Sequence, residues 1–308
     1  MRKLVLLCAS LCSIVLLFSA SPVQAQSVLW VASNGSDANV CSQTSPCGTF
    51  QGAINKGSVS QINCLTSGNY GAFTITASIT VDCGTGNIGT VSTTGSSNNA
   101  ITINTAFAAT IVLRHLGLNG NNSALDGIRT TAFASGTLVV EDCTIQSFLG
   151  DGILFEPSAG RGLLQVSDSR IFNNNTTGII VSPASNQIAS VTLNRVELTG
   201  NSSNGLALLT GVVAGTMRDS VVAGNGDDGV VTVATQVFFT VEGSSIVANL
   251  KTGIQTNSAG SVVNVGASTI GGNGTGVFPT AGSLISFGNN QMSANGTDGN
   301  FTSTTPLR

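Results

Sequence analysis

One short segment of the sequence recurs eight times, with an apolar residue at a fixed point of each copy. Successive copies are 27, 26, 27, 24, 24, 24 and 22 residues apart. A period in the twenties is typical of solenoids, in which each repeat buries its apolar face only by stacking on its neighbours. The sequence therefore predicts one elongated, stacked core. The apolar markers are Leu118, Ile145, Ile171, Leu198, Val222, Ile246, Ile270 and Met292.

Each repeat contains several short β-prone runs. In the unit 190–215 they are residues 191–193, 197–199 and 206–209, separated by turns rich in Asn and Gly. No window has the period of an amphipathic helix of normal length. The pattern predicts one coil of a parallel β-helix per repeat. A leucine-rich repeat has a similar period, but its Leu-x-x-Leu-x-Leu run is absent, so we disfavour it.

An asparagine column accompanies the repeat, three residues after each apolar marker. In-register coils lie about 4.8 Å apart, so these amides can bond one another in a ladder. Asn also tolerates the left-handed backbone of a sharp turn. We predict a structural ladder, interrupted where Phe148 replaces Asn and marks either a bulge or an aromatic on the flank. Its members are Asn121, Asn174, Asn201, Asn225, Asn249, Asn273 and Asn295.

The first 25 residues have the pattern of a signal peptide. Arg2 and Lys3 precede an apolar run over 4–18, and residues 23–25 form a small-residue cleavage site. The run is too short to span a bilayer comfortably, so we expect no stable membrane insertion. We predict an N-terminal strand, disulfide loop and capping helix over 26–60, and a β-helix over 61–308. Export would place the protein outside the cytoplasm, as a secreted, periplasmic or cell-surface protein.

Five cysteines remain after the predicted leader. Export permits disulfides, and we predict Cys41–Cys47, which closes a short loop, and Cys64–Cys83, which joins two strand-like segments. A four-cysteine zinc site is the competing reading, but its close CxxC pairs are absent. Cys143 lies two residues before an apolar marker, in a column of small inward-facing residues, and we expect a buried, inert thiol.

Charge is sparse and appears in pairs. Only 8% of the residues are charged and no basic cluster exists, which argues against nucleic acid as a partner. Alignment of the repeats places most basic residues one coil away from an acid, so we expect these charges to pair rather than to form an active site. The predicted pairs are Arg114 with Glu141, His115 with Asp142, Asp168 with Arg195, Arg170 with Glu197, and Arg218 with Glu242.

The chain resembles the secreted bacterial right-handed parallel β-helix proteins of the pectate-lyase-like superfamily. Residues 47–54 look like the short helix that caps such solenoids, 67–75 and 78–81 look like a first coil, and 29–37 resemble the opening strand and turn. The resemblance implies a right-handed β-helix but no particular activity, because the superfamily hosts lyases, hydrolases, esterases, adhesins and non-enzymes.

The enzyme signatures of that superfamily are incomplete here. Asp227 and Asp228 match the paired aspartates of the polygalacturonase-like hydrolases, but the expected His-Gly and Arg-x-Lys are absent. The weak catalytic candidates are therefore Asp151, Asp227, Asp228 and His115, the only histidine.

Asp126 and Asp151 each precede a turn glycine and would lie one coil apart, close enough to share a calcium ion, although Asp-Gly is first a turn signal. We expect Trp30 and Tyr70 to plug the N-terminal end of the solenoid.

These observations favour an exported structural or binding module, with polysaccharide as the candidate ligand and with no cofactor. The alternative is a polysaccharide lyase or glycoside hydrolase acting on an acidic polysaccharide. A cleft with unpaired acids and a free Arg or Lys would favour the enzyme. The oligomeric state and the ligand do not follow from the sequence.

Overall fold

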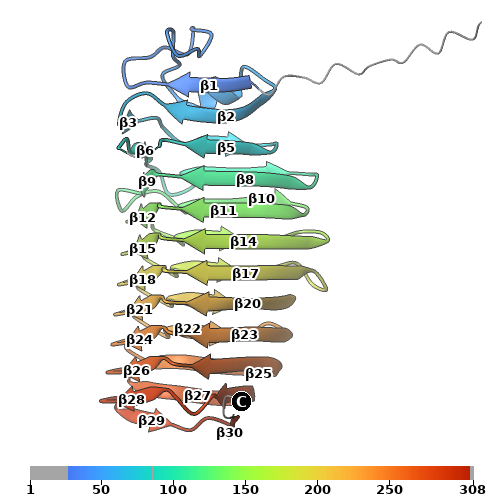
Figure 1. The fold of residues 1–308 in the computed structure, drawn as a ribbon, viewed down its shortest axis with the longest axis vertical. Coiled ribbons are helices and arrows are strands. Elements are labelled where there is room, and N and C mark those ends of the chain that lie inside the picture. Colours follow the sequence, from blue (N-terminus) through green and yellow to red (C-terminus); the bar gives the residue numbers. More distant parts are fainter. Residues whose placement is uncertain (1–26, 85, 306–308) are drawn as a thin grey trace, which may run out of the picture.

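The structure, a computed structural model, describes residues 27–84 and 86–305 and is a right-handed parallel β-helix (Figure 1). From the N-terminal end downward in Figure 1, the chain runs leftward along the front, turns at the left edge and returns behind. Neighbouring strands pair in parallel along the whole stack. The fold class predicted from the repeat and the resemblance is confirmed.

Each coil contributes a strand to each of three faces. The first sheet, at the front of Figure 1, contains β1 (Ser27–Val31), β2 (Val59–Cys64), β5 (Ile79–Asp82), β8 (Ala109–Arg114), β11 (Gly136–Glu141), β14 (Arg161–Ser167), β17 (Ile188–Asn194), β20 (Val212–Arg218), β23 (Gln236–Glu242) and β30 (Ser303–Thr304). The second sheet, at the left edge, contains β3 (Gly68–Asn69), β6 (Gly89–Ser92), β9 (Leu116–Asn119), β12 (Thr144–Gln146), β15 (Arg170–Phe172), β18 (Glu197–Thr199), β21 (Val221–Ala223), β24 (Ser245–Val247), β26 (Thr269–Gly271) and β28 (Gln291–Ser293). The third sheet contains β4 (Phe73–Ile75), β7 (Ile101–Thr105), β10 (Ile128–Phe133), β13 (Ile153–Phe155), β16 (Ile179–Val181), β19 (Leu206–Leu208), β22 (Val230–Thr232) and β29 (Thr297–Gly299). Two longer strands, β25 (Thr252–Gly266) and β27 (Thr275–Ser286), pass through the corner and join the first and third sheets.

The apolar markers of the repeat are the central residues of the second-sheet strands. Ile145 of β12 pairs with Leu118 of β9 on one side and with Ile171 of β15 on the other. Each of these side chains is at most 1% exposed. Because side chains alternate across a strand, the residues that flank each marker face outward. The repeat period thus sets the core.

A short helix closes the N-terminal end of the core. The helix α1 (Phe50–Ile54) begins at Thr49, whose hydroxyl accepts the N–H of Gly52 at 2.8 Å. The ring of Phe50 lies 4.9 Å from that of Tyr70, which is fully buried. Tyr70 therefore plugs the end of the core as predicted.

Six asparagines form a row of hydrogen-bonded amides inside the turn between the second and third sheets. The Nδ2 of each donates to the Oδ1 of the next, at 2.8–3.1 Å, from Asn174 through Asn201, Asn225, Asn249 and Asn273 to Asn295. Each Oδ1 also accepts a backbone N–H of the preceding coil, as between Asn201 and Asn225 at 3.1 Å. The row therefore satisfies turn groups that would otherwise be buried without a partner.

The structure corrects two details of this column. Asn121 is exposed, with φ of +51°, and its amide donates to Ser92 Oγ at 2.7 Å instead of joining the row. Phe148 is neither in a bulge nor on the flank: it is 1% exposed, and its N–H donates to Asn174 Oδ1 at 3.2 Å. A Cβ at Gly120 would come within 2.6 Å of the Phe148 ring, so this ring packs against the backbone at Gly120.

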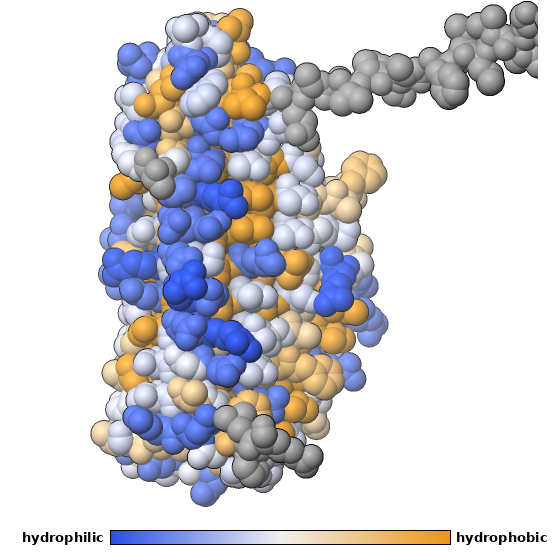
Figure 2. Space-filling view, in the orientation of Figure 1, coloured by the Kyte–Doolittle hydropathy of each residue, from blue (hydrophilic) through white to orange (hydrophobic). Residues whose placement is uncertain are grey.

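All five predicted charge pairs are present. The closest contacts are 2.6 Å for Arg114–Glu141, 3.6 Å for His115–Asp142, 2.6 Å for Asp168–Arg195, 2.7 Å for Arg170–Glu197 and 2.9 Å for Arg218–Glu242. They follow the turns between the first and second sheets, where Figure 2 shows a hydrophilic band running along the molecule. The exposed pairs contribute about 0–1 kcal/mol each and mainly reinforce the register of the coils.

Two disulfides are present, Cys41–Cys47 and Cys64–Cys83. Cys143 is free and 2% exposed, and its Sγ lies 3.3 Å from the carbonyl oxygen of Glu141. Burial raises the pKa of the Cys143 thiol to about 12. The thiol is therefore protonated and enclosed at neutral pH, so it is a packing residue and not a nucleophile.

Replacement of an amide in the middle of the row should destabilise the protein more than replacement at its end. Asn225→Ala removes two bonds that its Nδ2 donates and two that its Oδ1 accepts, and leaves the buried N–H of Asn201 unpaired. The expected cost is about 2–4 kcal/mol. Asn295→Ala, at the half-exposed end, should cost clearly less. Denaturant titration measures both, and equal losses would contradict a stacked ladder.

Cys143 should resist thiol reagents while the protein is folded. In protein lacking residues 1–25 we expect no labelling at pH 8 in native buffer and one labelled thiol per chain in denaturant, because burial keeps the sulfur protonated and inaccessible. Mass spectrometry of the labelled peptides measures this. Native labelling at the rate of an exposed cysteine would show that the thiol is not enclosed.

Candidate functional site

An open groove of about 540 Å³ lies on the second sheet beside His115. We call it the His115 groove. Its lining combines hydroxyl, carboxamide and apolar groups with one imidazole and one carboxylate. The lining residues are Gly86, Asn87, Ile88, Thr90, His115, Leu116, Gly117, Leu118, Asn119, Asp142, Thr144 and Gln146.

The hollow exists because one outward position carries no side chain. Gly117 lies between Thr90 of β6 and Thr144 of β12 in the register of the second sheet. All three residues are on the outer face of the sheet, so the missing side chain at Gly117 leaves a gap between two hydroxyl groups. A Cβ there would meet only Ile88 Cγ2, at 3.5 Å, which is an ordinary contact. The backbone can therefore accept a larger residue, and glycine here shapes the surface.

Two carboxylates hold His115 at the rim of the groove. The residue lies in the sharp turn between β8 and β9, with φ of +55°. Its Nδ1 is 2.8 Å from Asp82 Oδ1, and its Nε2 is 3.6 Å from Asp142 Oδ2. Asp82 fixes the orientation of the ring. Nε2 of His115 and Oδ2 of Asp142 both lie beside the groove, where each can accept a hydrogen bond from a ligand hydroxyl while His115 is neutral.

A second hollow, of about 330 Å³, continues from the groove towards the N-terminal end. Asn87 lines both hollows, and Asp82 lines the second while it bonds His115 of the first. Trp30 also lines the second hollow, which we call the Trp30 hollow. Trp30 is thus a half-buried surface residue on β1, and our expectation that it plugs the core is wrong. The parallel register explains this, because Trp30 pairs with Asn63 and Asn63 pairs with Asp82, all on the outer face.

No basic side chain other than His115 lines these two hollows in the described part of the chain. Arg114, next to His115, is bound to Glu141 at 2.6 Å. Arg170, one strand beyond Thr144, is bound to Glu197 at 2.7 Å and lies 5.1 Å above the ring of Phe172. The formal charge of the lining is therefore negative while His115 is neutral.

The other candidate carboxylates lie elsewhere, in the turns before the third sheet. Asp126 is 2% exposed, accepts the N–H of Asp151 at 2.8 Å and contacts Arg129 at 3.1 Å. Asp151 in turn accepts the N–H of Thr177 at 3.0 Å and the hydroxyl of Thr176. We expected the carboxylates of Asp126 and Asp151 to be close enough to share a calcium ion. In the structure their oxygens accept hydrogen bonds from protein groups. Residues 27–84 and 86–305 contain no group of three or more His, Cys, Asp or Glu side chains arranged to hold a metal ion.

Asp227 and Asp228 lie in different surroundings although they are adjacent in the sequence. Asp227 is bound to Lys251 at 2.6 Å on the surface. Asp228 is 7% exposed, and its Oδ1 accepts the N–H of Thr252 at 2.9 Å. Burial raises the pKa of Asp228 despite the opposing bonds from Thr252. One carboxylate is therefore neutralised by a lysine, and the other is built into a turn.

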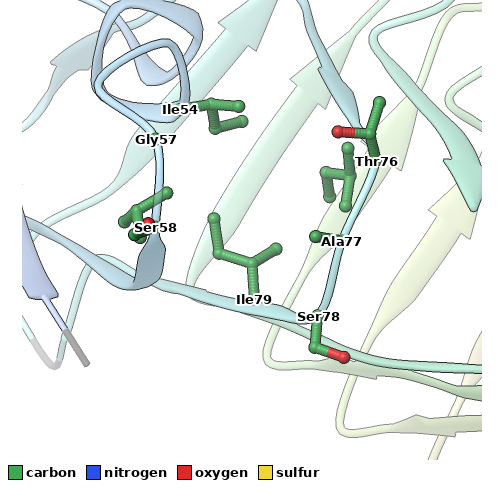
Figure 3. Close-up of a pocket in the computed structure, with 9 residues that line it drawn as sticks. Ile54, Gly57, Ser58, Thr76, Ala77, Ser78 and Ile79 are labelled. Atoms are coloured by element: carbon green, nitrogen blue, oxygen red, sulfur yellow. The ribbon is translucent and has the colours of Figure 1, made fainter. Parts of the chain in front are cut away.

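A third hollow, of about 170 Å³, lies beside the N-terminal cap (Figure 3). Ile54 and Ile79 project towards its centre, and the polar groups on its rim are the hydroxyls of Ser58, Thr76 and Ser78. Nothing that lines it can titrate or ionise. It offers no acid–base chemistry, and its volume is about a third of that of the His115 groove.

Of the four catalytic candidates proposed from the sequence, only His115 lies in the groove. Asp82 and Gly117 were missed, although the sequence holds a signal for each. Asp82 ends a β-prone run two strands before β11, and the run pairs in register with β8, so extending the repeat towards the N-terminus would have placed it beside Arg114. Gly117 precedes an apolar marker at a position where later copies have Thr144 and Arg170.

No protein-family model matches the sequence, and no curated protein is similar to it. The fold is similar to that of several solved structures. A crystal structure of pectate lyase Pel9A superposes with a TM-score of 0.65 and 14% identity, over 90% of this chain and 79% of that one. The A-modules of the mannuronan C-5 epimerases AlgE4 and AlgE6 of Azotobacter vinelandii have TM-scores of 0.59, with 17% and 20% identity, over 80% of this chain and 70% of theirs.

These similarities define the class of the protein by its fold. The chain has the parallel β-helix fold of a pectate lyase, as the resemblance implied. At such low identity the similarity extends to the fold alone, because one fold hosts many activities. In the described residues, no helix is long and apolar enough to cross a membrane.

Replacement of Asp228 by Asn should not weaken the protein at neutral pH. Because the folded-state pKa is raised above the unfolded one, ionisation of Asp228 lowers stability as pH rises through the range between the two values. An amide keeps the acceptor for Thr252 without this cost, as Asn204 does for Asp228 one coil earlier at 3.1 Å. Denaturant titration at pH 7 should find Asp228→Asn at least as stable as the wild type, with the difference shrinking towards pH 4. A clear loss at pH 7 would contradict this.

Proposed function

We propose that the protein is a polysaccharide-binding module and that the His115 groove, continued by the Trp30 hollow, is its binding site. The observation that carries the proposal is the gap at Gly117. It opens the second sheet between two hydroxyl groups, beside the carboxamides of Asn119 and Gln146. Sugars present hydroxyls that both donate and accept hydrogen bonds, and this lining offers both kinds of partner.

The apolar parts of the site fit the same ligand. Ile88, which is 59% exposed, forms one wall of the groove. Trp30 offers an amphipathic ring of the kind that is enriched where one side of a contact is apolar and the other is wet. Ligand sites commonly combine an apolar lining with a few polar groups that fix orientation. A sugar ring offers both apolar and polar groups, with C–H groups on its flat faces and hydroxyls at its edges.

The fold and the cysteines support the same proposal. The names of the similar structures include a pectate lyase and two mannuronan epimerases, which are proteins that act on polysaccharides. The two disulfides suit an extracellular setting, where a long polymer would be met. The predicted signal peptide, in residues 1–25, lies outside the described residues.

A catalytic role is the second candidate function, and one observation favours it. Asp82 holds Nδ1 of His115, so Nε2 faces a groove and could transfer a proton as a general acid or base. A polysaccharide lyase or glycoside hydrolase would use such a group. The residue facing Nε2 is Asp142, and no free Arg or Lys lines the groove to steady the carboxylate of an acidic sugar.

The proposal predicts that truncation of a groove amide weakens binding without unfolding the protein. Gln146 lies on the outer face of β12, so Gln146→Ala should lower affinity for a bound polysaccharide by about tenfold, roughly the value of one hydrogen bond. Thr199→Ala, in the same outward row two strands away, is the matched control and should bind normally. Affinity electrophoresis in polysaccharide gels measures both.

The same assay separates binding from catalysis. The wild type should retain the polysaccharide without releasing reducing ends or unsaturated products. If products are released by the wild type and by Thr199→Ala but not by His115→Ala, the protein is an enzyme and not a binding module. Equal affinities for Gln146→Ala and wild type would remove the groove as the binding site.

A further inference from the structure

The charge balance of the site separates two classes of polysaccharide. Pectate and mannuronan, named for the similar structures, are polymers of acidic sugars. An acidic chain laid along the His115 groove and the Trp30 hollow would lie against the carboxylates of Asp142 and Asp82. Like charges repel, and close repulsion at a partly buried site costs more than on an open surface. Arg and Lys bind carboxylates most strongly, and the described lining contains neither.

The nearby cations do not supply this charge. Arg114 is committed to Glu141, and Arg170 to Glu197. His115 is the only lining residue that can become positive, and its two nitrogens face one carboxylate each. Even with His115 protonated, the three side chains of His115, Asp82 and Asp142 would together carry a formal charge of −1. Binding of an anion would therefore require an ion pair to break.

We propose that the site takes an uncharged polysaccharide, in contrast to the acidic polymers of the similar folds. The inference rests on the proposed function and names the class of its ligand. Hydroxyls of a neutral sugar can donate to Asp142, to Asp82 and to Nε2 of a neutral His115, and can accept from the amides of Asn119 and Gln146, so each group has a hydrogen-bond partner and no charge is brought into the site.

The extent of the site fits a chain rather than a single sugar. Five neighbouring strands of the first sheet, β1, β2, β5, β8 and β11, lead from Trp30 to the turn that holds Asp142. With strands about 4.8 Å apart, the span along the helix axis is about 19 Å. A polymer laid along the axis would contact Trp30 at one end and Thr144 and Gln146 at the other.

The test compares neutral and acidic polymers on the full chain without its leader. Isothermal titration against soluble neutral β-glucan, xylan and galactomannan, and against polygalacturonate and alginate, should show binding to a neutral polymer at least about tenfold tighter than to either acidic one. Because no ion pair forms, the affinity should be unchanged between low and high salt. Asp142→Asn should reduce the difference in affinity between neutral and acidic polymers, because it should raise the affinity for the acidic ones.

A filled groove is the decisive variant. Gly117→Val places two methyl groups in the gap without strain at the backbone, and should reduce neutral binding more than tenfold. Ala223→Val, outward on β21 in the same sheet, adds similar bulk outside the groove and should bind normally. Circular dichroism and thermal unfolding establish that both variants fold.

Each outcome bears on one level of the proposal. Preferred, salt-sensitive binding of an acidic polymer that Gly117→Val abolishes would overturn the neutral ligand while leaving the binding function. Neutral binding that survives Gly117→Val would overturn this site. Binding to none of the polymers would overturn the proposed function itself.

Discussion

In-register stacking of parallel coils is the constraint on which the rest of the structure depends. A strand of one coil has no hydrogen-bond partner within that coil, so its backbone is satisfied only by the coils above and below. Strict register also aligns like positions into columns. Buried Asn amides then bond one another, and surface charges of opposite sign meet, as for Arg114 and Glu141. Each coil has only a small core, which is stabilised because the coils above and below cover it with apolar residues at the same positions.

The candidate site is a local departure from this uniformity. Along the outer face of the second sheet, one column lacks a side chain where Gly117 follows Thr90 and precedes Thr144, and the other lacks one at Gly271, between Val247 and Ser293. The missing side chain at Gly117 opens the His115 groove. The stacking of the coils places the imidazole of His115, held by Asp82, at the rim of this groove and Trp30 in the adjoining hollow. Each of these residues lies on or beside a paired strand. Such a surface suits recognition of an extended polymer, whose own repeat runs along the same axis.

The fold followed from the sequence because the repeat carries it directly. Marker spacing located the second sheet, and the alternating charges located five ion pairs, since register alone decides those contacts. The site did not follow. The residues of the His115 groove come from three coils and from the turns that join their first-sheet and second-sheet strands, and Asp82 lies in a coil whose sequence lacks the full motif. Asp126 and Asp151 looked like site residues because they would lie one coil apart, and Asp228 because it belongs to a pair of aspartates. Their burial within turns depends on three-dimensional packing. Phe148 shows the same limit: nothing local reveals whether an aromatic in a polar column points inward or outward.

The central claim is that ligand binds across the outer face of β9 and β12, and hydrogen exchange tests it most directly. Backbone amides at residues 115–119 and 142–146 should exchange more slowly when a saturating neutral polysaccharide is added, while those of β21 and β24 on the same sheet should not change. Protection confined to the third sheet, around Asp126 and Asp151, or to the hollow beside α1, would contradict the account and move the binding site there.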